Sequence, residues 1–391
     1  MMKKILIGYA KGNEELLNRQ SALGSYILTL AKMFDEIGYQ VQVNNMSLSE
    51  LLAFPYTQSP PPIGRAKLSK WIPNFCKQIV RDLKCFSFIN QLIENISVNN
   101  FKPDFILEFY VYGSNLGLRL KNLYRTPLFT VFDSPVLEEH EFFNGRKRFF
   151  RNEILSRQFN TLSLSDNVVV YSQAVKDYCI KNGIERRKIS IHQNIDFSRF
   201  DFLDVKFEAL NFNIVFIGSF LKWHKVECLV YAFKKLLDEN LPVSLQLIGY
   251  GMEFAKISEL VNKLGLREKV YMPGFCDGQQ LLDLKKKAHI GVMPGSNWYG
   301  APNKVFEYAA AGLLVLAPAT PTIDALFSED SGLIFFEDGN SNEMYLNLKW
   351  AVSHWNEASQ KAKTFQSYIQ SQYSGEKTID FYTHLFSGEV S

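Results

Sequence analysis

The chain has 391 residues, 47% of them hydrophobic and 21% charged, which is the composition of an ordinary globular protein long enough for two domains. It has no apolar run approaching the roughly 18 residues of a membrane span, and its five cysteines form no Cys-x-x-Cys pair, so we expect a cytoplasmic protein without a disulfide framework or zinc site. Residues 1–200 carry 26 Lys and Arg against 18 Asp and Glu, whereas residues 201–391 carry 17 against 22, and this asymmetry predicts two domains with different partners.

The first half alternates short apolar runs with amphipathic stretches. Residues 5–9 are a run of the buried-strand type, residues 22–34 carry apolar side chains at helical spacing, and residues 41–43 begin a second strand. Further strands of this half are predicted at residues 105–109, 128–132, 168–172 and 189–192. The order strand, glycine-containing loop, helix, strand is the opening of a doubly wound α/β domain.

Two segments of the first half, residues 65–88 and 142–159, combine basic with aromatic side chains. They could rest on an anionic membrane, such as the inner face of the plasma membrane, or hold an anionic acceptor, since each basic residue near such a surface is worth about 1 kcal/mol. The alternative is that both are solvated helix faces covering an apolar groove.

The second half repeats the α/β pattern after residues 196–211, a linker without sustained periodicity. Its predicted strands lie at residues 214–218, 245–249, 270–272 and 290–293, and helical stretches separate them. Strands that alternate with helices of ten or more residues indicate a parallel sheet with both faces covered.

The last of these strands leads into the most informative stretch of the chain, residues 293–312. A loop of small and turn residues follows the strand, and a helix then opens at Pro302, a residue suited to the first helical position. Gly312 suits the position just past the end of that helix.

The polar face of this helix predicts a phosphate site. Lys304, Glu307 and Tyr308 are three and four residues apart and should share the face opposite the apolar stripe. The free N–H groups of Asn303 and Lys304, the helix dipole and the ammonium group would converge on one small volume. The alternative is a plain surface ion pair between Lys304 and Glu307, worth about 0.2–0.5 kcal/mol.

Residues 302–317 (Pro-Asn-Lys-Val-Phe-Glu-Tyr-Ala-Ala-Ala-Gly and an apolar strand) resemble the donor-site signature of the retaining GT-B glycosyltransferases of the group-one, or family-four, class. Three further pieces match that family in order: Gly-Ser-Phe to Trp-His-Lys-Val-Glu at 218–227, Ile-Gly-Tyr-Gly-Met at 248–252, and the stretch 265–275. The first half matches only generically.

The resemblance implies the GT-B fold, an α/β fold of two doubly wound Rossmann-like domains whose parallel sheets face a central cleft. Residues 1–195 would bind the acceptor, residues 212–370 would bind a nucleotide-sugar, and a helix within residues 371–391 would pack back on the first domain.

The resemblance also assigns roles to residues. Lys304 would bind the diphosphate of the donor and Glu307 its ribose hydroxyls, whereas Tyr299 replaces a second glutamate that touches the sugar in many relatives. The complete set of expected donor-binding residues is Gly218, Ser219, Lys222, Gly249, Gly251, Gly274, Phe275, Tyr299, Gly300, Ala301, Asn303, Lys304, Val305 and Glu307.

Departures from the family pattern concern the charges around the leaving diphosphate, which needs cationic or N–H stabilisation. Ser219 replaces the usual arginine and His224 the usual lysine, so Lys304 must act with help from Lys222, His224 or Lys225. A first-domain histidine of some relatives aligns with Asp133, which would place a carboxylate near the reacting sugar, unless Asp133 is only a turn residue. The expected catalytic residues are therefore Lys304, His224 and Asp133.

We therefore expect a metal-independent, retaining glycosyltransferase that moves a sugar from a nucleotide-diphosphate donor to a saccharide or lipid-linked acceptor in polysaccharide, glycan or glycolipid assembly. The chain has no Asp-x-Asp motif, so no metal or other cofactor is expected, and nucleic acid is not an expected partner. Two alternatives stay open: a nucleotide-sugar epimerase of the same fold, and a catalytically inactive GT-B subunit that regulates a partner enzyme. A dinucleotide oxidoreductase is disfavoured because Gly249-x-Gly251 lacks the third glycine.

Overall fold

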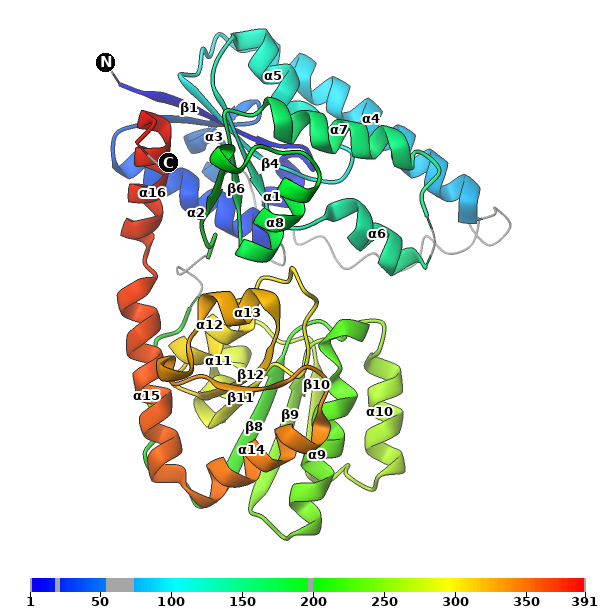
Figure 1. Ribbon diagram of the computed structural model, residues 1–391, viewed down its shortest axis with the longest axis vertical. Coiled ribbons are helices and arrows are strands. Elements are labelled where there is room, and N and C mark those ends of the chain that lie inside the picture. Colours follow the sequence, from blue (N-terminus) through cyan, green and yellow to red (C-terminus); the bar gives the residue numbers. More distant parts are fainter. Residues whose placement is uncertain (1, 18–21, 54–73, 146, 196–199, 390–391) are drawn as a thin grey trace. The chain divides into compact units, whose positions relative to one another are not determined.

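The computed structural model describes residues 2–17, 22–53, 74–145, 147–195 and 200–389 (Figure 1). The chain folds into two compact units, one of Met1–Ser198 with Gly375–Ser391 and the other of Arg199–Ser374. Residues 65–73 and 146, which belong to the predicted basic segments, lie outside the described residues. As this division shows, the first unit contains both the first and the last residues of the chain.

The first unit is built on one sheet of seven strands with the order β3-β2-β1-β4-β5-β6-β7. All neighbouring strands run parallel except β2 and β3. Its elements are β1 (Lys4–Tyr9), α1 (Asn13–Leu16), α2 (Ala22–Glu36), β2 (Gln40–Val43), β3 (Met46–Ser47), α3 (Leu48–Ala53), α4 (Asn74–Val98), β4 (Phe105–Phe109), α5 (Leu116–Tyr124), β5 (Leu128–Phe132), α6 (Val136–Asn144), α7 (Arg151–Leu164), β6 (Asn167–Val170), α8 (Gln173–Lys181), η2 (Arg186–Lys188), β7 (Ile189–Ile191) and α16 (Gly375–Ser387).

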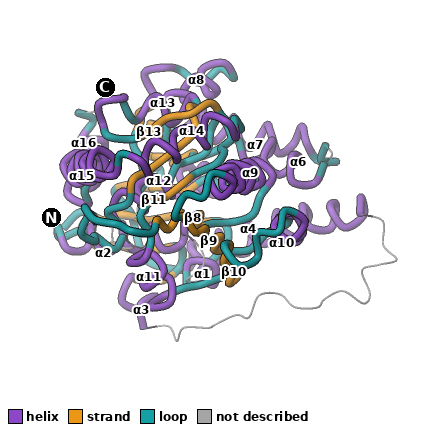
Figure 2. The backbone as a smooth tube through the Cα atoms, turned by 90° about the horizontal axis from the view of Figure 1, so that it is seen from below, coloured by secondary structure: helices purple, strands orange, loops and turns teal. Residues whose placement is uncertain are grey.

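The second unit has a fully parallel sheet of six strands with the order β10-β9-β8-β11-β12-β13. Its helix α9 packs against β9 and α10 (Figure 2), and α12 packs against β12 and α15. Its elements are β8 (Phe212–Ile217), η4 (Lys222–His224), α9 (Val226–Asp238), β9 (Val243–Ile248), α10 (Phe254–Lys263), β10 (Val270–Gly274), α11 (Gly278–Lys287), β11 (Ile290–Val292), α12 (Asn303–Ala310), β12 (Leu314–Ala319), α13 (Pro321–Leu326), η5 (Glu329–Ser331), β13 (Ile334–Glu337), α14 (Ser341–Ser353) and α15 (Trp355–Gln372).

The apolar runs of the sequence become central strands because both faces of each sheet are covered. Ile5, Leu6 and Ile7 of β1 are completely buried, as are Leu314 and Val315 of β12. Such strands carry no hydrophilic alternation because neither face meets water. The predicted α/β class with two parallel sheets is confirmed.

The C-terminal helix α16 is part of the first unit and contributes to its core. The ring of Phe386 stacks on Phe105 of β4 at 4.9 Å between centroids and on Phe34 of α2 at 5.7 Å. Tyr382 is fully buried in the same cluster. The chain therefore ends in the unit in which it begins.

Candidate functional site

Glycines follow β8 and β9 and end β10 in the second sheet, and those after β8 and β9 let the backbone pack unusually tightly. Gly249 and Gly274 adopt φ values of 127° and 82°, which side-chain-bearing residues rarely adopt. A Cβ atom on Gly249 would overlap the carbonyl oxygen of Gly218, and one on Gly251 would lie 2.6 Å from the backbone of Phe220. The segments that follow β8 and β9 therefore form a layer of closely packed backbone at the carboxyl edge of the sheet.

Lys304, at the start of α12, reaches across this layer. A Cβ atom on Gly218 would overlap Cε of Lys304, so the absence of a side chain at Gly218 is what lets the lysine lie there. Its Nζ lies 3.1 Å from Nε2 of His224 and 6.0 Å from the centre of the Phe216 ring. The structure thus brings together three residues that the sequence analysis had associated: Gly218, His224 and Lys304.

The hydrogen bonds of His224 define its tautomer. Its Nδ1 lies 3.3 Å from the carbonyl oxygen of Gly295, which can only accept, so Nδ1 carries the hydrogen. Nε2 is then the acceptor for the Lys304 ammonium. Burial and the neighbouring charge of Lys304 lower the pKa of His224 to about 3. His224 is therefore neutral at physiological pH and adds no positive charge for a phosphate.

Burial also lowers the pKa of Lys304, to about 8, an effect that the charge of Glu307 partly opposes. At pH 7 the group is still mostly an ammonium. In the free protein this ammonium group has lost much of its hydration, so an approaching anion stabilises its charge.

Glu307 does not pair with Lys304. Its Oε1 lies 2.6 Å from Nζ of Lys285 in α11, and the same Nζ lies 3.1 Å from Oδ2 of Asp201. The alternative of a surface Lys304–Glu307 ion pair is therefore wrong. Sequence reasoning missed Lys285, although it continues the apolar stripe of Leu281 and Leu284, a spacing that places it on the buried face.

The first turn of α12 differs in part from the prediction. Pro302 is the residue before the helix rather than the first helical residue. The N–H of Asn303 donates to the carbonyl oxygen of Ala301 at 2.9 Å, so it is not free as predicted, whereas no such bond is found for the Lys304 N–H among the described residues. One backbone donor and one ammonium group remain for a ligand.

The far end of α12 follows the prediction at Gly312 and contradicts it at Tyr308. Gly312 has a φ of 67° and follows Ala311, the C-cap residue of the helix, and Leu313 N donates to Tyr308 O. Tyr308, however, is fully buried, and its hydroxyl accepts a 2.7 Å hydrogen bond from Ile217 N. It is therefore buried rather than on a polar helix face, and its hydroxyl bonds to the residue that precedes Gly218.

The two lysines near His224 in the sequence do not contact Lys304. Lys222 is exposed, and Lys225 pairs with Asp338 at 2.8 Å. Among the three residues predicted to assist Lys304, only His224 therefore contacts it. Ser219, which replaces the usual arginine, is exposed beside them.

The remaining predicted donor-binding residues lie in loops at the same edge or in α12. Phe275 is 57% exposed after β10, and Gly300 and Ala301 are half-buried in the loop before α12. Tyr299 is nearly buried, with its ring 5.0 Å from that of Trp298. Val305 is fully buried, so only its backbone could face a ligand.

Asp133 lies in the first unit, just after β5 at the carboxyl edge of that sheet. Burial raises the pKa of its carboxyl group to about 6. Asn194 donates to its Oδ1 at 3.2 Å, and the hydroxyl groups of Tyr26 and Tyr382 both donate to the amide oxygen of Asn194. The carboxyl group is thus held by Asn194, which two tyrosines from distant segments of the chain hold in turn.

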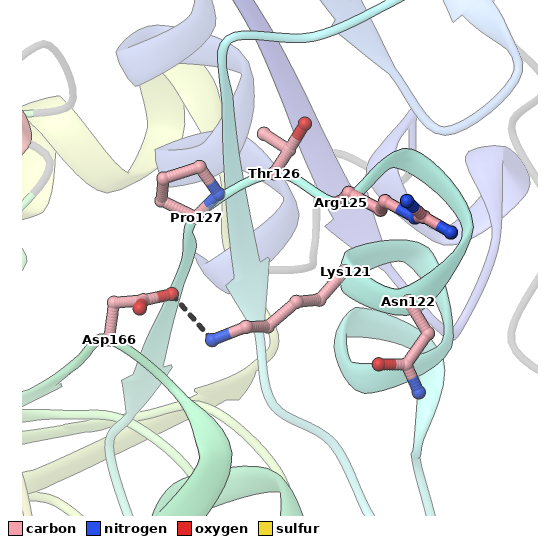
Figure 3. A pocket seen from close by; sticks show the side chains of 6 residues that line it. All are labelled: Lys121, Asn122, Arg125, Thr126, Pro127 and Asp166. Carbon is pink, nitrogen blue, oxygen red and sulfur yellow. Dashed lines mark hydrogen bonds and ion pairs between the residues drawn. The ribbon is translucent and has the colours of Figure 1, made fainter.

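A surface hollow of the first unit is a poor candidate for an anion site. Figure 3 shows its lining side chains: Lys121, Asn122, Arg125, Thr126, Pro127 and Asp166. It lies where α5 ends and β5 begins, at the edge opposite Asp133, and Lys121 is already paired with Asp166 at 2.7 Å. The C-terminus of a helix also repels anions. In the part of the chain that the structure describes, no group of His, Cys, Asp and Glu side chains is arranged to hold a metal ion.

Comparison with known proteins associates each half of the chain with a glycosyltransferase family. The family described as "Glycosyltransferase Family 4" matches residues 23–195, and "Glycosyl transferases group 1" matches residues 205–368. No curated protein matches the chain.

Solved structures similar to the chain cover nearly all of it at low identity. Sucrose-phosphate synthase from Thermosynechococcus elongatus is 15% identical with a TM-score of 0.72, over 99% of this chain and 100% of that one. HepE from Anabaena in complex with UDP-glucose is 14% identical with a TM-score of 0.67, over 98% and 99% of the two chains. A glycosyltransferase from Rickettsia africae is 14% identical with a TM-score of 0.61, over 100% and 99%.

Proposed function

Because the chain is a glycosyltransferase of the GT-B fold, we propose that it transfers a sugar from a nucleoside-diphosphate donor to an acceptor hydroxyl, with retention of configuration and without a metal ion. The similar HepE structures hold UDP and UDP-glucose, which makes UDP-sugars the first donors to test. Polysaccharide, glycan or glycolipid assembly is the proposed setting.

The position of Lys304 carries this proposal. Its ammonium group lies over the bare backbone of Gly218 at the start of a helix, where the dipole and the Lys304 N–H favour an anion. Burial removes water from the ammonium group and thereby lowers its pKa. A diphosphate that binds there would stabilise the positive charge in place of the lost water. Glu307, on the same helix, would accept hydrogen bonds from the ribose hydroxyls.

In the proposed reaction the bond between the anomeric carbon and the diphosphate oxygen breaks as the bond to the acceptor oxygen forms on the same face. The acceptor proton passes to the leaving diphosphate oxygen, so no separate nucleophile is needed. Lys304 stabilises the negative charge that develops on the diphosphate. Asp133 is proposed to lie near the reacting sugar or the acceptor, where its carboxylate would orient a hydroxyl group.

Thermal shift tests the donor site. We expect one of UDP-, GDP-, ADP- or TDP-sugars to raise the melting temperature in the presence of EDTA, since a ligand at 100 times its Kd adds about 2.7 kcal/mol of stability. Lys304→Ala and Glu307→Ala should lose this response. An unchanged response in both variants would place the donor elsewhere.

Turnover tests the reaction itself. In donor hydrolysis without acceptor, NMR of the first sugar released should show the anomer of the donor, whereas the opposite anomer would refute retention. Binding without any turnover across acceptors would favour the inactive regulatory subunit, and conversion of the donor into another nucleotide-sugar would favour the epimerase.

We further propose that α4 touches an anionic membrane that carries the acceptor. Val80 and Leu83 are each about half exposed there, beside the exposed basic residues Arg81 and Lys84. No described helix is both long and apolar enough to span a membrane. Sedimentation with vesicles containing anionic lipid should capture the wild type, and Arg81→Glu with Lys84→Glu should release it. Equal capture by neutral vesicles would contradict the charge-based contact.

A further inference from the structure

Two opposite charges on α12 that would ordinarily pair are kept apart. Lys304 and Glu307 are three residues apart on one helix, a spacing at which lysine and glutamate attract each other. In the structure the Nζ of Lys304 instead lies 3.1 Å from His224 Nε2, and Oε1 of Glu307 lies 2.6 Å from the Nζ of Lys285. Each of the two charges is therefore directed to a different partner.

Lys285 is an uncommon partner because its side chain is only 4% exposed. Burying an ammonium group is costly unless carboxylates compensate its charge, and here Glu307 and Asp201 both do so. The next two lysines of α11, Lys286 and Lys287, are exposed. The burial thus singles out the one lysine of the three that contacts Glu307.

We propose that His224 and Lys285 are positioning residues that hold Lys304 and Glu307 apart, which keeps the ammonium group available to the donor diphosphate and the carboxylate available to the ribose. The inference rests on the proposed donor site. Oε2 of Glu307 makes no hydrogen bond to any described residue, so one carboxylate oxygen is left for a ligand while Lys285 holds the other. Lys285 acts through Glu307 and need not touch the donor.

The consequence of losing Lys285 follows from the positions of the remaining charges. Glu307 would lose its nearest cation, and Lys304, one helical turn away on the same helix, would become its next partner. That pairing would neutralise the ammonium group intended for the diphosphate. The nucleotide should then bind weakly because its cation is occupied, even though Lys304 itself is intact.

A double-mutant cycle tests this reasoning. Titration calorimetry would measure the Kd of UDP, or of GDP or ADP if the wild type binds one of those more tightly, for the wild type, Lys285→Met, Glu307→Gln and the double variant. In an otherwise wild-type protein, we expect Lys285→Met to weaken nucleotide binding about tenfold, because the diphosphate loses a charge-assisted contact with Lys304. In the Glu307→Gln background the same substitution should change the Kd less than about twofold, because no carboxylate remains to pair with Lys304.

A merely structural role of Lys285 predicts a different pattern. Its loss would then weaken nucleotide binding by the same factor in both backgrounds, and that result, or an unchanged Kd in Lys285→Met, would overturn the inference. His224→Leu should behave like Lys285→Met and should likewise lose its effect in the Glu307→Gln background.

Controls separate folding from positioning. Lys286→Met removes an exposed lysine of the same helix and should leave the Kd unchanged, and Lys285→Arg keeps the cation and should keep wild-type affinity. If Lys285→Met does not fold, Lys285→Gln takes its place in the cycle. The double variant has a glutamine at position 307, so it buries no unpaired carboxylate there. If the wild type binds no nucleoside diphosphate, the donor site itself is refuted. That outcome differs from one in which the wild type binds the nucleotide but Lys285→Met weakens binding equally in both backgrounds.

Discussion

Replacing Lys304 with methionine should stabilise the ligand-free protein at neutral pH while abolishing its response to the donor. Burial lowers the pKa of Lys304 from 10.5 to about 8. Because the folded state holds this proton less tightly than the unfolded state, the charged lysine penalises folding below pH 8, and the penalty fades as the pH rises from 8 to 10.5.

The two pKa values put this penalty at about 3 kcal/mol at pH 7 and about 1 kcal/mol at pH 9.5, as upper values for a side chain that water partly reaches. Methionine forfeits the 3.1 Å hydrogen bond to His224, worth about 1 kcal/mol. Its chain is long enough to keep the contacts over Gly218. We therefore expect Lys304→Met to be more stable by about 2 kcal/mol at pH 7 and about equal to the wild type at pH 9.5.

Urea unfolding followed by tryptophan fluorescence measures this difference. Of the five tryptophans, Trp223, Trp298, Trp350 and Trp355 lie in the unit that contains Lys304, so the signal reports mainly on that unit. Lys222→Met, which removes an exposed lysine nearby, should change stability at neither pH. The reasoning is refuted if Lys304→Met is less stable than the wild type at pH 7 or if the difference does not shrink at pH 9.5.

Donor affinity should fall as the pH rises through about 8, because Lys304 then loses its charge; calorimetry at pH 7 and 9 checks this, and a flat profile would contradict it. The rate of sugar transfer should fall as the pH drops through about 6, where Asp133 takes up a proton, and Asp133→Asn should be slow at every pH. Gly249→Ala should cost at least about 2 kcal/mol of unfolding free energy, because the new methyl group overlaps Gly218, whereas Gly265→Ala, with a φ of 70° and open space around it, should cost about 1 kcal/mol. Tyr308→Phe should cost about 1–3 kcal/mol in urea unfolding, since it leaves the Ile217 N–H without its acceptor.

The elements of the second unit could be read from local patterns because each depends on neighbours in sequence. Apolar runs became the parallel strands, and Gly312 ended α12 as its conformational freedom predicted. The family resemblance singled out Gly218 and Gly249 as donor-binding positions, but the close approach of their backbones is visible only in the structure. Tyr308 was expected on the polar face but is buried. Helical periodicity alone cannot distinguish a tyrosine hydroxyl that bonds to a strand backbone from one that is exposed to water.

The sequence by itself therefore determined the fold class, the family and the segment in which a donor site should be sought, since these follow from periodicity, turn residues and motifs in register. Only the tertiary structure decided which charges meet: Lys285, 22 residues before Glu307, holds that carboxylate, and His224, 80 residues before Lys304, holds the ammonium group as a neutral acceptor. The family resemblance led us to expect a C-terminal helix on the first unit, but only the structure shows that Tyr382 of this helix supports Asn194, which in turn bonds to Asp133. Such partners are chosen by burial and distance in space, and a buried charge takes whichever opposite group the fold brings within reach, which spacing along the chain does not reveal.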